Sequence, residues 1–209
     1  MDTTVPPRSM ARTTGSRHAP AGFGEVLTYW HGLRRGRPVP ARADIDPTAI
    51  QRHLGHCAII ERGPTGKIKF RVAGKAFGDI LGMDPRGMPV SALFNMGLRD
   101  RLAALLAAVF TGPETLTMTM TMGAGAEKDV QQMRGMIALP LSDTSGDVTR
   151  ALIMISLDAV NGTTPQRFWI HDARLTPVLD GNSRPSDRTR FRLTCGERPV
   201  LRVIEGGRG

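Results

Sequence analysis

Two histidines and a cysteine lie close together in the sequence and are the first candidates for chemistry. His53 precedes a predicted strand, His56 and Cys57 begin it, and Glu61 ends it. Imidazole nitrogens and thiolates bind zinc, but a zinc site needs four ligands, or three ligands and a water molecule. His56 is expected to lie past the helix that carries His53, so the two rings do not share a helical face. We therefore predict partly exposed histidines at a helix–strand junction and no metal site.

No nucleophile, base and acid recur at a spacing that indicates a catalytic set. The stretch AGFGEV, residues 21–26, contains part of a dinucleotide-binding fingerprint, but no predicted strand precedes it, as that fingerprint requires. We predict that the protein is not an enzyme. The alternative is a small-molecule enzyme, which would need a charged or histidine side chain directed into the core.

A third candidate is the alternating stretch TLTMTMTM, residues 115–122. A period of two places the threonines on one face of a strand and the leucine and methionines on the other. Methionine is flexible and fills irregular volumes. The methionine face therefore fits two interpretations, a packed core or a pocket for a small apolar ligand.

The elements around this strand are predicted from hydrophobic periodicity. An amphipathic helix spans residues 23–35, and Asp46 is expected to cap a short helix that has Pro47 in its first turn. Strands are predicted at residues 56–61, 67–73, 115–122, 130–141 and 150–158, with broken helical turns over 74–94 and a longer helix over 96–110. The predicted organisation is a disordered N-terminus (1–22), one domain (23–159) and a flexible basic tail (160–209).

The segments YWHGLRRGRPVPARADIDP, FRVAG and GMDPRGMPV resemble a family of short bacterial proteins with a single PAS domain. The similarity extends over roughly residues 22–158. The matching residues are Trp30, Leu33, Arg34, Gly36, Arg37, Pro40, Arg42, Asp44, Asp46, Pro47, Phe70, Arg71, Gly74, Gly82, Asp84 and Gly87. The resemblance implies a sensory or protein-interaction module, acting in signal transduction, that has no catalytic residues. It also implies an α+β fold, in which a five-stranded antiparallel sheet carries short helices on one face.

In this PAS-like order the methionine strand lies at one edge of the sheet and the lysine-bearing strand, residues 67–73, at the other. The methionines then face the helices, whereas the threonines, Lys67, Lys69 and Arg71 face outward. A hypothetical ligand-binding pocket on the inner face is lined by apolar residues. They are Phe70, Phe77, Ile80, Leu106, Met118, Met120 and Ile137.

The strands around residues 57–60 and 152–157 are apolar on both faces, so the outer face of the sheet also needs a cover. The helix over 23–35 offers Leu27, Trp30 and Leu33 for this purpose. We expect Trp30 to pack near Ile59 or Ile155, in its own subunit or across a homodimer that uses this helix as its interface.

The known cofactors of PAS domains are not expected here. Haem-binding members carry a histidine in the long helix, and light-sensing flavin members carry a cysteine in the broken helical segment. The sequence has neither residue in these places, so we predict no cofactor. Because the domain is not expected to leave room for an enzymatic output domain, its partner is expected to be another protein, as yet unidentified.

The net charge of +9 is concentrated in the flanks, since residues 43–159 carry equal numbers of acidic and basic side chains. A nucleic-acid-associated regulator that uses these flanks is a further alternative. We do not favour it, because no aromatic residues alternate with the arginines. Cys57 and Cys195 are far apart, and no signal peptide or membrane span is evident. This pattern predicts a cytoplasmic protein with reduced cysteines.

Overall fold

The structure, a computed structural model, describes residues 22–122, 134–157, 165–178 and 190–192. Its helices are α1 (Phe23–Leu33), α2 (Lys75–Leu81) and α3 (Arg99–Thr111), with 3-10 helices η1 (Arg42–Asp44), η2 (Pro47–His56), η3 (Val90–Leu93) and η4 (Met96–Leu98). Its strands are β1 (Cys57–Arg62), β2 (Ile68–Ala73), β3 (Glu114–Met122), β4 (Arg134–Ser142), β5 (Val148–Ser156), β6 (Phe168–Pro177) and β7 (Arg190–Arg192). The predicted disordered N-terminus lies outside the described residues except for Gly22, and so does Cys195.

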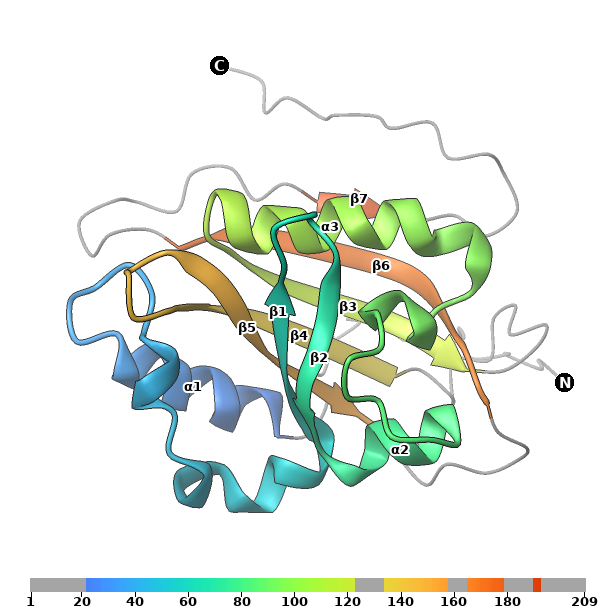
Figure 1. The fold of residues 1–209 in the computed structure, drawn as a ribbon, viewed down its shortest axis with the longest axis horizontal. Helices are drawn as coiled ribbons and strands as arrows, with labels where there is room; N and C mark the ends of the chain where they lie inside the picture. The colour runs from blue at the N-terminus through green and yellow to red at the C-terminus, as the bar shows by residue number, and fades with distance from the viewer. Residues whose placement is uncertain (1–21, 123–133, 158–164, 179–189, 193–209) are drawn as a thin grey trace, which may run out of the picture.

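The strands form one antiparallel sheet in the order β2-β1-β5-β4-β3-β6-β7 (Figure 1). The α+β class and the order of the first five strands agree with the PAS-like prediction. The count of five strands is wrong, because residues 168–177 and 190–192, which lie in the predicted flexible tail, extend the sheet. β3 is therefore an interior strand, whereas the prediction placed it at the edge.

The front face of the sheet is covered by α2, η3 and α3. Their buried side chains join those of all six strands from β1 to β6 in one apolar cluster, which we call the front core. On α3 the buried residues are Leu102, Leu105, Leu106, Val109 and Phe110. Their spacing of three or four residues places them on one side of the helix. The sequence period thus directs this side of α3 toward the sheet.

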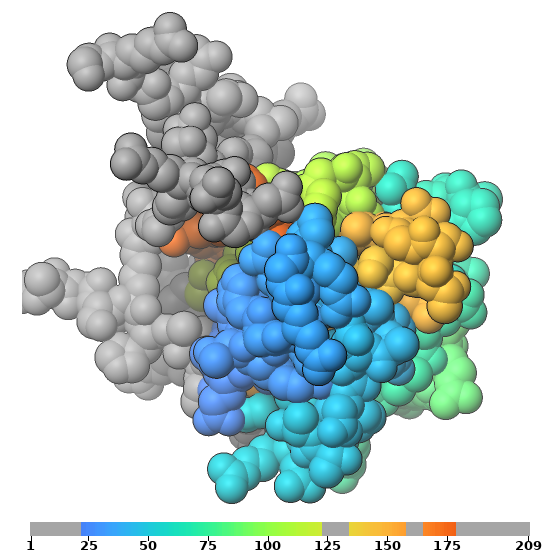
Figure 2. Space-filling view, turned by 90° about the vertical axis from the view of Figure 1, so that its left-hand side faces the viewer, coloured from blue at the N-terminus to red at the C-terminus, as the bar shows by residue number. Residues whose placement is uncertain are grey.

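The back face of the sheet is covered by α1, η1 and η2. Phe23, Val26 and Trp30 of α1 pack with back-facing residues of β1, β4 and β5 in a second cluster, the back core. Figure 2 shows α1 and the segment after it, in blue, as one continuous cover on this side of the molecule. The prediction that α1 covers the outer face of the sheet is confirmed.

The two ends of α1 are fixed by local backbone geometry. Gly22 has a φ of 88°, and a Cβ atom there would lie 2.7 Å from the His53 ring. At the other end Arg35 and Gly36 have φ values of 47° and 84°. Such left-handed residues end a helix.

No helix among the described residues is long and apolar enough to cross a membrane.

Candidate functional site

Six of the seven residues predicted to line a pocket come together in the front core. Phe70, Phe77, Ile80, Leu106, Met118 and Met120 are each at most 2% exposed and belong to one cluster. The rings of Phe70 and Phe77 are 5.5 Å apart and tilted by 59°. These side chains fill the space between the sheet and the helices with apolar groups.

The seventh residue, Ile137, lies on the opposite face, so its assignment to the inner face is wrong. β4 is buried along both faces from Gly135 to Leu141. Its sequence therefore gives no polar–apolar alternation from which the facing could be read. The register decides the facing, because Met136 is paired with Met118 and shares its side of the sheet. Ile137 consequently points into the back core.

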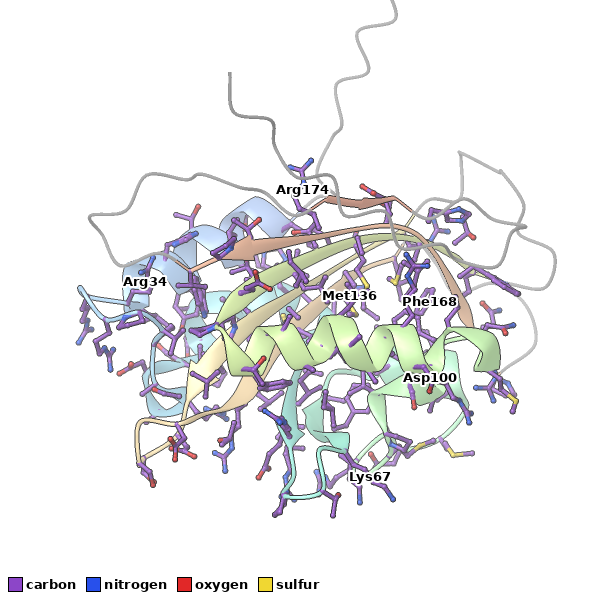
Figure 3. All side chains as sticks on the ribbon, turned by 90° about the horizontal axis from the view of Figure 1, so that it is seen from above. Arg34, Lys67, Asp100, Met136, Phe168 and Arg174 are labelled. Atoms are coloured by element: carbon purple, nitrogen blue, oxygen red, sulfur yellow. The ribbon has the colours of Figure 1, made fainter. Side chains whose placement is uncertain are left out.

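Met136 is a site residue that the sequence analysis missed. It is fully buried and adds a third thioether to those of Met118 and Met120. Figure 3 places it between the sheet and α3. Its pairing with Met118 could not be derived before the β3–β4 register was known.

The alternation of β3 holds until a β-bulge near its end. Leu116, Met118 and Met120 are buried on the front, and Thr117 is exposed on the back. The β3–β6 register shifts between Thr119 and Met120, which leaves His171 without an opposite residue. At this bulge Thr121 is 2% exposed, and its Oγ1 lies 2.8 Å from His171 Nε2. The bulge therefore places a polar contact between β3 and β6, near the end of the strand that carries the methionines.

The front core is closed at one end by the beginning of β6. Phe168 is fully buried, and its ring lies 5.9 Å from that of Phe94. The Arg167 Nη1 donates to the Ala92 carbonyl at 2.9 Å. The sequence analysis placed this stretch, RFWI, in the tail. The signal that could have identified it is the pattern of apolar residues at Phe168 and Ile170.

The predicted interface residues on α1 belong mainly to the back core of their own subunit. Trp30 is fully buried, and its Nε1 donates to the Pro140 carbonyl at 2.9 Å. It joins Ile59 in the back core, as expected, whereas Ile155 belongs to the front core. Trp30 therefore has no surface for a contact between subunits. Leu27 and Leu33 are half-buried against the same cluster.

The candidate metal ligands do not converge. His53 Nε2 lies 2.8 Å from Glu25 Oε2, and this contact lowers the pKa of Glu25. Cys57 is a buried free thiol, and burial raises its pKa to about 12. In the part of the chain that the structure describes, no three His, Cys, Asp or Glu side chains gather as metal ligands. The pair of His53 with Glu25 links η2 to α1.

The first of the segments that carry the PAS resemblance, residues 29–47, builds the turn between α1 and η2. Arg37 Nη2 lies 2.5 Å from Asp44 Oδ2, which also accepts from the Ala41 amide at 2.9 Å. These contacts hold the pKa of Asp44 below its usual value. Asp46 accepts from the Thr48 amide and caps η2, as predicted, while its own amide donates to the Tyr29 hydroxyl. The motif therefore fixes the path of the chain across the back face.

One corner of the back face is left open beside β2. Val72 pairs with Ile59 but is 53% exposed, and Leu54 at the end of η2 is 38% exposed. The backbone of η2 approaches the residue after β2 closely, because a Cβ atom at Gly74 would lie 2.1 Å from the Leu54 carbonyl oxygen. The ion pair of Arg71 with Glu61 borders this surface and lowers the pKa of Glu61. We call Leu54 and Val72 the open corner.

Comparison with known sequences identifies one family whose match includes helices of both the front and the back cover of the sheet. No curated protein matches this chain. A family described as PAS domain matches residues 19–156 of the 209, which include all elements from α1 to β5. The matched part contains both cores except for the front-core residues of β6. The chain therefore belongs to the PAS domain family, whose members are sensory and regulatory modules.

Proposed function

We propose that this PAS domain regulates other proteins by binding them and that its front core accepts a small apolar ligand. The observation that carries the interaction is the open corner. Val72 stands on a strand opposite a buried isoleucine, yet 53% of its surface is exposed. Contiguous exposed apolar surface marks sites of contact between proteins. We infer that Leu54, whose carbonyl oxygen lies beside Gly74, extends the surface at Val72.

We include a homodimer in the proposal, in which two copies meet at the open corner when no other protein occupies it. The outer side of α1 supports this choice over the α1 interface, because Glu25, Thr28 and His31 are exposed there. A contact through Val72 buries apolar surface, which is the main source of association free energy. The same corner on two copies can meet about a twofold axis.

The ligand part of the proposal is supported by the chemistry of the front core. Phe70, Phe77, Met118, Met120 and Met136 offer aromatic rings and thioethers. Thioether side chains repack around apolar molecules of different shape. Such a lining suits an apolar ligand better than a reacting substrate, so we favour this function over an enzyme on a cupped sheet. The alternative of a nucleic-acid-associated regulator gains no support from the described residues.

The proposal includes a cytoplasmic location. Cys57 is a free thiol. Free buried cysteines are typical of proteins in reducing compartments.

Native mass spectrometry of the protein and two variants tests the proposal. Val72→Asp places a charge in the open corner, and Met83→Asp places the same charge at another exposed apolar residue, which is 59% exposed. We expect a dimer for the wild type and Met83→Asp, and a monomer for Val72→Asp. A Val72→Asp protein that dimerises like the wild type would contradict the assigned contact. Protein isolated from its own host should also retain an apolar small molecule.

A further inference from the structure

The first residues of β6 close the front core at the end where α2 and η3 meet the sheet. The Gln166 amide donates to the Ile80 carbonyl at 2.9 Å, and the Asn95 amide donates to the Phe168 carbonyl at 3.1 Å. The Arg167 guanidinium donates to the Ala92 carbonyl at 2.9 Å. These three bonds tie residues 166–168 to α2 and to the stretch formed by η3 and the residues just after it. We call residues 166–170 the closing segment.

Phe168 is the side chain that this segment inserts into the core. It is fully buried, and it lies opposite Met122 in the β3–β6 register, with Ile170 opposite Met120. Its ring packs against Phe94. Figure 3 shows Phe168 at the end of the front core nearest the start of α3, whereas Arg174 points away from the core. Phe168 thus separates this end of the methionine-lined core from the surface.

The bulge at His171 divides β6 into two unequal ladders. Residues 168–170 pair with 120–122, and residues 172–177 pair with 114–119. The shorter ladder can therefore open while the longer one stays paired, because the residue at the bulge already interrupts the register. Local opening of a short unit costs less free energy than unfolding of the whole strand. His171 is placed to act as the hinge.

We propose that a small apolar molecule, about the size of one aromatic ring, enters the front core at the closing segment and takes the place of the Phe168 ring. This inference rests on the ligand part of the proposed function. Residues 166–170 open about His171, Phe168 leaves its seat, and Met120 and Met122 repack around the ligand. The bond from Arg167 to Ala92 acts as the latch, since it holds the segment closed from outside the core.

Toluene is a suitable probe because it has one aromatic ring and no polar group. Its binding to the full chain is followed by NMR of isotopically labelled methionine methyl groups. Met120 and Met136 report on the front core, and Met154 of the back core serves as an internal reference. We expect toluene to shift the Met120 signal and to leave the Met154 signal unchanged.

Two arginine variants test the latch. Arg167→Ala removes the bond to Ala92, while Arg174→Ala removes the same side chain from the other ladder of β6. Loss of a hydrogen bond from a charged donor should raise the rate of toluene association about tenfold in Arg167→Ala. Arg174→Ala should bind toluene at the wild-type rate. Equal association rates in the two folded variants, with the Met120 signal shifted in both, would overturn the closing segment as the entry and leave the core ligand intact.

Phe168→Ala provides a second measurement. An apolar cavity left by a removed side chain stays dry and binds small aromatic molecules. We expect this variant to bind toluene at least about tenfold more tightly than the wild type, with the largest shift at Met120. If toluene shifts no front-core methyl group in the wild type, in Arg167→Ala or in Phe168→Ala, both this inference and the ligand part of the proposed function are wrong.

Discussion

The two faces of one sheet are packed by different kinds of side chain. The front core contains three buried methionines and lies under several short helices and α3. The back core is centred on Trp30, whose ring is buried and whose N–H is bound to the Pro140 carbonyl. A buried indole that has a hydrogen-bond partner is held in one orientation, whereas thioether side chains adapt. We therefore expect the side chains of the front core to repack more readily than those of the back core.

The same contrast extends to the covers of the two faces. Polar contacts join the segments of the back cover to one another. They include the ion pair of Arg37 with Asp44 and the hydrogen bonds between Tyr29 and Asp46. The front core is closed at one end by the segment that carries Phe168, and the bonds of that segment run to carbonyl and amide groups. We therefore expect ligand-dependent change on the front and a constant scaffold on the back.

The largest expected effect comes from a charge placed in the front core. Met120 is fully buried, while Thr119, one residue earlier, points to the opposite face and pairs with Asp172. An unpaired buried charge costs several kcal/mol, so Met120→Lys should lower the melting temperature strongly or prevent folding. Thr119→Lys should change the free energy of unfolding by less than about 1 kcal/mol. Equal melting temperatures for the two variants would show that the facing of β3 is wrong.

The next effect tests the rigidity of the back core. Trp30→Ala should cost about 3–5 kcal/mol, which is typical of a buried tryptophan. Trp30→Phe keeps most of the ring but leaves the Pro140 carbonyl without its donor, and should cost about 1–3 kcal/mol. Denaturant unfolding measures both. As a control, Trp169→Ala should cost less than Trp30→Ala, because the Trp169 side chain on β6 is only half-buried. The reverse order would contradict the assigned rigidity of the back core.

The smallest expected effect concerns the turn that anchors the back cover. The pKa of Asp44 is held below its usual value of 3.8, mainly by the hydrogen bond from Arg37. A carboxylate whose pKa is lower in the folded state stabilises that state above its unfolded pKa, and this contribution is lost as the pH falls through the folded value. Asp44→Asn should therefore melt at a lower temperature than the wild type at pH 7, and the difference should shrink below about pH 3.8. A difference in melting temperature that is constant from pH 7 to pH 3 would exclude this ion pair as its cause.

Local sequence patterns determined much of this protein. The apolar stripe of α1, the cap at Asp46, the alternation of β3 and the two-sided burial of β1 and β5 follow from spacing and residue type. The three segments at residues 29–47, 70–74 and 82–90 together indicated the PAS family. It was also possible to predict that α1 covers the outer face, because apolar strands need burial on both sides.

Only the tertiary structure decided the remaining features, because they depend on which strands pair and in which register. The facing of Ile137 and Met136 follows from the β3–β4 register, which the uniformly apolar sequence of β4 does not specify. The addition of β6 to β3 was hidden because residues rich in proline, glycine and arginine surround it and its bulge breaks the period of two. Phe168 is buried in the front core only because β6 pairs with β3. A long-range pairing of this kind is set by backbone hydrogen bonds and shared burial between distant segments, and no local pattern records it.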